Sequence, residues 1–166
     1  MFGGLKKLFG GGSAGAGGNI LSAPVSGNVI PMSQVNDPTF SQEILGTGVA
    51  IVPSEGRITA PANGEITMVF DTLHALSMTT DSKAELIIHV GLDTVQLNGK
   101  YYKAYVKAGD RVKAGDLLLE FDMDQIKAAG YDITTPVIVC NTPEFPNMKC
   151  YSGMEVKEQD RIIDLG

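Results

Sequence analysis

Apolar positions in this chain come in short runs. From residue 20 onward, Gly, Pro, Asn or Asp interrupts the runs every few residues, a pattern typical of many short strands. The clearest runs cover residues 48–52, 65–70, 85–90 and 116–121. Helical spacing is scarce, and its best candidate is residues 123–129, which end before a glycine. The pattern predicts an all-β fold, either a sandwich or a barrel.

Two internal echoes indicate duplicated β units with short helical turns. Residues 22–29 resemble residues 59–66, and each segment reads as a proline-containing turn that leads into a strand. Residues 106–110 recur as residues 112–116. This second spacing is too short for a solenoid repeat, so it favours two successive turns.

Composition divides the chain into a leader and one domain. Eight glycines among the first 18 residues predict that residues 1–18 are a flexible leader, and the length allows one domain over residues 19–166. Within residues 1–9 the apolar side chains could share one helical face, which would permit weak contact with a membrane surface. Those side chains are Phe2, Leu5, Leu8 and Phe9.

Charge and hydropathy narrow the class of partner and the compartment. The net charge is -6, which argues against binding a phosphate backbone and therefore against nucleic acid. No apolar run approaches the ~20 residues that cross a bilayer, so we expect a soluble, cytoplasmic protein. The two cysteines, Cys140 and Cys150, show no metal or redox spacing and are interpreted as reduced structural thiols.

The two histidines are the most informative residues. His89 follows an apolar strand and His74 precedes another, with a polar segment between them. A hairpin with a two-residue turn at 81–82 would place Thr80 opposite Lys83 and His74 opposite His89, with both rings on one exposed face. A register shift of one residue would separate them.

Two imidazoles on one face favour nucleophilic chemistry. Each positive charge would lower the proton affinity of the neighbouring ring, so at least one ring should be neutral at physiological pH. Thr72 lies two residues before His74, on the same face of an extended chain, and its hydroxyl could fix the tautomer of His74. His89, His74 and Thr72 are therefore the candidate catalytic residues.

Several motifs in order resemble one known family. They cover residues 58–64, 71–75, 85–95, 107–116, 120–122 and 134–141. From residue 20 to residue 164 the chain resembles the enzyme IIA component, glucose class, of the bacterial phosphoenolpyruvate:sugar phosphotransferase system. The chain departs from the usual pattern at residues 98–102, where a glycine and a phenylalanine are more usual.

The resemblance implies a phosphocarrier that is a component of a protein-histidine phosphotransferase. It implies that His89 accepts a phosphoryl group from the phosphocarrier protein HPr, that His74 steadies the group, and that Thr72 bonds to His74. The acceptor would be the EIIB domain of a glucose-class permease, and no cofactor or metal is implied. The implied docking residues are apolar Phe40, Ile44, Phe70 and Ile87 and acidic Asp37 and Asp93.

Two other classes stay open on the residues alone. A biotinyl or lipoyl carrier is also a small β fold, and Lys149 would be its modified lysine, although no Met-Lys-Met run surrounds it. A zinc hydrolase could use the two histidines, but catalytic zinc usually needs three protein ligands. A partner that supplied a carboxylate could complete a zinc site at the same pair.

Overall fold

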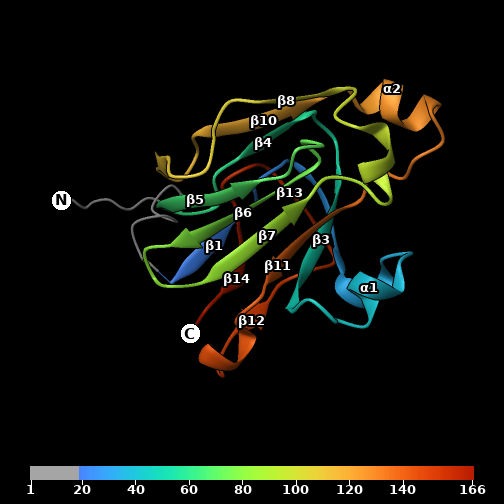
Figure 1. The fold of residues 1–166 in the computed structure, drawn as a ribbon. Coiled ribbons are helices and arrows are strands. Elements are labelled where there is room, and N and C mark those ends of the chain that lie inside the picture. The colour runs from blue at the N-terminus through green and yellow to red at the C-terminus, as the bar shows by residue number, and fades with distance from the viewer. Residues whose placement is uncertain (1–18) are drawn as a thin grey trace.

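The computed structural model describes residues 19–166 and builds them mainly from short antiparallel strands (Figure 1). One sheet has eight strands and two others have three strands each. In spatial order the large sheet contains β13 (Met154–Val156), β2 (Gly27–Pro31), β3 (Thr47–Pro53), β11 (Thr135–Val139), β7 (Glu85–His89), β6 (Ala75–Thr80), β5 (Gly64–Val69) and β9 (Arg111–Val112). The all-β prediction is confirmed.

The remaining elements surround this sheet (Figure 1). The small sheets contain β4 (Arg57–Thr59), β10 (Leu117–Phe121) and β8 (Tyr102–Ala104), and β1 (Ile20–Ser22), β14 (Arg161–Asp164) and β12 (Lys149–Cys150). The helical segments are η3 (Met32–Gln34), α1 (Pro38–Ser41), η4 (Thr94–Leu97), α2 (Met123–Ala128) and η5 (Thr142–Glu144). The expected helix at 123–129 is therefore present as α2, whereas α1 was not predicted.

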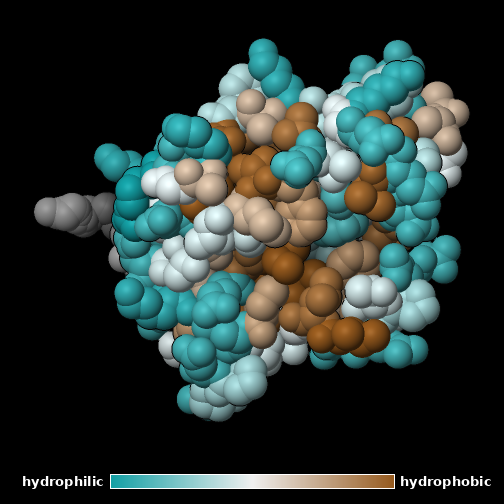
Figure 2. Space-filling view, in the orientation of Figure 1, coloured by the Kyte–Doolittle hydropathy of each residue, from teal (hydrophilic) through white to brown (hydrophobic). Residues whose placement is uncertain are grey.

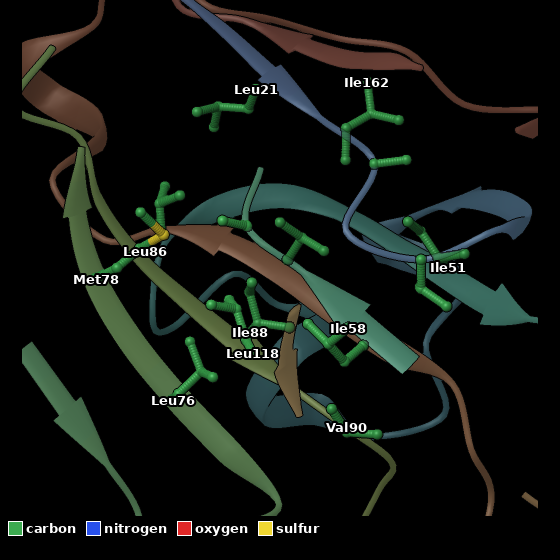
Figure 3. Packing of buried hydrophobic residues seen from close by; sticks show 14 of the residues in the cluster. Leu21, Ile51, Ile58, Leu76, Met78, Leu86, Ile88, Val90, Leu118 and Ile162 are labelled. Carbon is green, nitrogen blue, oxygen red and sulfur yellow. The ribbon is translucent and has the colours of Figure 1, made fainter. Parts of the chain in front are cut away.

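The core fills the space between the large sheet and the small ones. Along β6 and β7, alternate residues point into this space, where Leu76, Met78 and Ile88 are each at most 1% exposed (Figure 3). They meet Ile58 from β4 and Leu118 from β10. Burial of each such side chain stabilises the folded state by roughly 1.5–3 kcal/mol. The intervening residues of β7 face away from this core, and His89 is one of them.

The duplicated units contact each other at their echoed segments. The backbone N–H of Ser22 donates to the carbonyl of Pro61 at 2.9 Å, and that of Thr59 donates to the carbonyl of Pro24 at 2.7 Å. The two bonds are equivalent under the repeat that was read from the sequence. The echo therefore reflects a structural duplication.

The second echo marks two turns of the same type, as expected, and a third turn has the same form. In residues 107–110, 113–116 and 157–160 the aspartate side chain accepts a bond from the backbone N–H of the first residue at 2.8–3.0 Å. Ala60 N donates to the carbonyl that ends the second turn, and Ala23 N to the one that ends the third. The third turn contains no glycine, which is why the repeat did not reveal it.

Two predictions, a flexible leader at residues 1–18 and membrane contact through residues 1–9, lie outside the described residues. Within residues 19–166, none of the helices has both the length and the apolar character that crossing a membrane requires. Both cysteines are free thiols.

Two valines in β3 test the position of the core. Val49 is 1% exposed and Val52 is 39% exposed. We expect Val49→Ala to lower the free energy of unfolding by about 2 kcal/mol, because it removes buried methyl groups and leaves a cavity. The matched change Val52→Ala should cost less than about 0.5 kcal/mol. Urea denaturation of both variants measures this, and equal losses would contradict the assigned core.

Candidate active site

The pairing of β6 with β7 brings the two histidines together, but in a different register from the one predicted. Ala75 lies opposite His89, so the predicted pairing of His74 with His89 is wrong by one residue. The connection has three residues instead of two, because Thr80 bonds to Ala84. Lys83 adopts a left-handed conformation with φ 75°, as is typical of three-residue hairpin loops.

The imidazoles nevertheless meet. Their ring centroids lie 4.7 Å apart, with the planes at 83°. His74 precedes β6 and belongs to a turn in which Leu73 has φ 61°, so strand alternation does not set the direction of its side chain. His74 is only 2% exposed, which corrects the expectation that both rings lie on an exposed face. His89 is partly exposed and forms the accessible side of the pair.

The backbone after β7 fixes the tautomer of His89. Nδ1 of His89 lies 2.7 Å from the carbonyl oxygen of Gly91. Because a carbonyl can only accept a hydrogen bond, Nδ1 carries the proton, and Nε2 of the neutral ring keeps its lone pair. Gly91 was not among the residues predicted for the site. Its only sequence signal was a glycine directly after the strand end, and its φ of 93° requires glycine.

Thr72 holds the other histidine. Its Oγ1 lies 2.7 Å from Nδ1 of His74. The contact expected from the sequence is therefore present, although the residues share a turn and not an extended strand. The hydroxyl can donate to or accept from this nitrogen, so the bond fixes the position of the ring.

Burial keeps both rings neutral near physiological pH. Desolvation, followed by the repulsion of His89, lowers the pKa of His74 from 6.5 to about 4. Desolvation also lowers the pKa of His89, while its bond to Gly91 and the charges of Asp37 and Asp93 oppose the change. Both imidazoles are therefore neutral, and the side chains of Asp37 and Asp93 lie near His89.

Apolar side chains enclose the pair. The ring of Phe40 lies 4.9 Å from that of His89, and the ring of Phe70 lies 5.4 Å from that of His74. Ile87 is partly buried and packs against a second, smaller group of buried apolar side chains that includes Phe40. Figure 2 shows apolar side chains gathered across this face of the molecule and toward α1, with hydrophilic residues at its margin.

The two acidic residues, Asp37 and Asp93, lie near enough to His89 to act on its pKa, whereas no contact joins Ile44 to the histidines among the described residues. Asp37 caps α1 by accepting a bond from Thr39 N at 3.0 Å, and Pro38 begins the helix, so a four-residue helix suffices to place Phe40. Asp93 is exposed and precedes η4 with φ 59°. Ile44, in the segment between α1 and β3, is 67% exposed.

Other possible sites lie apart from the histidines. A cavity of about 560 Å³ is lined by residues that include Tyr101, Lys103, Phe121 and Asp124, and neither histidine contributes to it. Lys149 lies within β12 opposite Asp164, not at the tip of a hairpin. In the described part of the chain, no three His, Cys, Asp or Glu side chains are grouped to hold a metal ion. The two histidines by themselves would supply two ligands.

Comparison with known proteins identifies the family of this chain. Residues 19–145 match the model of the family described as phosphoenolpyruvate-dependent sugar phosphotransferase system, EIIA 1. The chain is 48% identical over 145 residues to the beta-glucoside-specific EIIBCA component of Halalkalibacterium halodurans and 46% identical over 143 residues to that of Bacillus subtilis. These matches cover 87% and 86% of the chain.

The chain spans less than a quarter of the length of those relatives, 23% and 22%. Among solved structures, glucose permease IIA from Mycoplasma capricolum matches with a TM-score of 0.80 at 32% identity, covering 89% of this chain and 95% of that one. The family match covers most of the described residues and includes both histidines, Thr72 and Gly91. This chain therefore belongs to the EIIA family, type 1, of the phosphoenolpyruvate-dependent sugar phosphotransferase system.

Proposed function

We propose that this domain carries a phosphoryl group on Nε2 of His89. The observation that carries the proposal is the 2.7 Å contact between Nδ1 of His89 and the Gly91 carbonyl, because it leaves Nε2 as the nitrogen with a free lone pair. The lowered pKa of His89 supports it, since a neutral ring is the nucleophile. The group would come from a phosphohistidine of HPr.

The transfer is a displacement in line between two nitrogens. The lone pair of His89 Nε2 forms a bond to phosphorus while the bond from phosphorus to the nitrogen of the donor breaks, and its electron pair returns to the donor imidazole. The protein positions the acceptor and offsets charge, and the reaction requires no cofactor. When the group leaves, the acceptor forms a bond to phosphorus while the bond from phosphorus to Nε2 of His89 breaks, and its electron pair returns to His89.

His74 supplies the hydrogen bond to the transferred group. This role needs the tautomer in which Nδ1 of His74 accepts from the Thr72 hydroxyl, 2.7 Å away, because Nε2 then carries a proton and can donate to a phosphoryl oxygen. The two ring centroids lie 4.7 Å apart, so both imidazoles would reach one phosphoryl group. Burial makes this donor rigid, since it lies only 2% exposed.

The surface around the pair suits protein partners. The apolar side chains would keep water away from the phosphoramidate, which water hydrolyses; they are Phe40, Phe70, Ile44 and Ile87. The acidic side chains of Asp37 and Asp93 would contact a basic partner such as HPr. The acceptor would be the EIIB domain of a glucose-class permease. Because the relatives at 46–48% identity are beta-glucoside-specific EIIBCA components, a beta-glucoside EIIB domain is the first acceptor to test.

Loss of the nucleophile should abolish labelling. We expect His89→Ala to take up no phosphate from labelled phospho-HPr, whereas the wild-type domain takes up one phosphoryl group per chain. Autoradiography and intact-mass spectrometry measure the uptake. Exposed Asp71→Asn, in the turn before His74, is a control that should label normally. Stoichiometric labelling of His89→Ala would show that another residue accepts the group.

Substitution of the second histidine should separate the two half-reactions. In His74→Gln the amide can still donate a hydrogen bond, so His89 should accept phosphate. Onward transfer to an EIIB domain should slow by about 10²-fold or more, because the imidazole and its Thr72 contact are lost. Single-turnover measurements follow each step. The assigned roles would be wrong if His74→Gln abolished uptake as completely as His89→Ala, or if it left both steps unchanged.

The neutral state of the pair predicts a pH-dependent stability. Between pH 6.5 and about 4 the unfolded chain binds a proton at His74 that the folded chain does not, so stability falls as pH falls through this window. From pH 7.5 to pH 5 the contribution of His74 should drop by about 2 kcal/mol. Urea denaturation of wild type and His74→Gln measures it. An equal loss in both proteins would mean that His74 titrates normally.

A further inference from the structure

The peptide between Val90 and Gly91, one residue beyond the end of β7, is hydrogen-bonded at both its C=O and its N–H. The Val90 carbonyl accepts from Thr94 Oγ1 at 2.8 Å and from the hydroxyl of Tyr102 at 2.7 Å. The N–H of Gly91 donates to the carbonyl of Thr134 at 3.1 Å. Val90 and Thr94 are fully buried and Tyr102 is 8% exposed. Water therefore does not replace these bonds.

The next peptide carries the acceptor for His89. Leu92 N donates to the carbonyl of Asp132 at 2.9 Å, and because N–H and C=O point in opposite directions across a trans peptide, the Gly91 carbonyl is aimed at His89 Nδ1. Only the two dihedrals of Gly91 link this peptide to the preceding one. A Cβ on Gly91 would lie 2.5 Å from Cγ2 of Thr94, so the two residues are in close contact.

Tyr102 reaches this loop from another sheet. It begins β8, and its ring stacks near Phe121 of β10 with the centroids 6.3 Å apart. Burial raises the pKa of Tyr102 to about 12, against a smaller opposite effect of the Thr94 hydroxyl, so the phenol stays protonated and can donate at neutral pH. A single hydroxyl thus connects the small sheet to the backbone beside the nucleophile.

We propose that Tyr102 and Thr94 are positioning residues that jointly hold the Val90 carbonyl and so keep the Gly91 carbonyl on Nδ1 of His89. Their effect on transfer rests on the proposed function of His89 Nε2. Their effect on the tautomer does not. Because the two hydroxyls share one acceptor, each compensates in part for the loss of the other.

The test combines Tyr102→Phe, Thr94→Val and the double variant, each of which removes a hydroxyl with little change in shape. Nitrogen-15 NMR of the imidazoles at pH 7.5 reports the tautomer of His89, and labelled phospho-HPr reports uptake. We expect a single Nδ1–H tautomer in the wild type and a measurable Nε2–H population in the variants. Each single variant should slow uptake about two- to fivefold, and the double variant by more than the product of the two, because the buried carbonyl then has no donor.

Tyr105→Phe is the matched control, since this tyrosine also lies beside β8 but is 44% exposed and bonds to Glu120. It should change neither the tautomer nor the rate. An unchanged Nδ1–H population in both single variants overturns the proposal even if the double variant fails to fold, and so do losses that simply multiply. If the tautomer shifts as expected while phosphate is found on a residue other than His89, the positioning role stands and the proposed function fails.

Discussion

Nδ1 of His89 and the carbonyl of Gly91 lie 2.7 Å apart, and the rest of the site is arranged around this bond. It assigns the proton to Nδ1 and the lone pair to Nε2, whereas a free histidine side chain exchanges between both tautomers. A backbone acceptor is well suited to the task because it cannot itself titrate. The bond requires the left-handed backbone of Gly91 and the buried contacts that hold the residues on either side of it.

Opposing electrostatic effects set the protonation of the pair. Desolvation lowers both histidine pKa values, whereas Asp37 and Asp93 act in the opposite direction on His89. The carboxylates lie on the partly exposed side, where they can also meet a partner, and His74 lies on the buried side. The arrangement keeps His89 neutral, and the bond to Thr72 holds the buried second imidazole in position.

The placement of the pair is consistent with exchange between proteins. His89 forms the partly exposed side of the pair, and the rings of Phe40 and Phe70 lie beside the two histidines. Neither histidine lines the cavity beside β8 and β10. A domain that transfers a group between macromolecules needs such an accessible face, covered only when a partner docks. The all-β frame supplies a rigid support, because β7 is hydrogen-bonded to a neighbour on each side.

The sequence by itself determined the all-β class, the main strands and the duplication, because alternation and turn residues are local signals. It also predicted that His74, His89 and Thr72 lie together, although the hairpin register used for this was wrong by one residue. It did not determine the register of β6 and β7, since Asp-Ser permits several turns and the αL conformation of Lys83 was not visible in the pattern. The burial of His74 and the bond to Gly91 likewise came only with the tertiary structure. Both depend on backbone with positive φ, at Leu73 and Gly91, and the backbone around Gly91 is held by bonds to Thr134 and Asp132, which lie far away in the sequence.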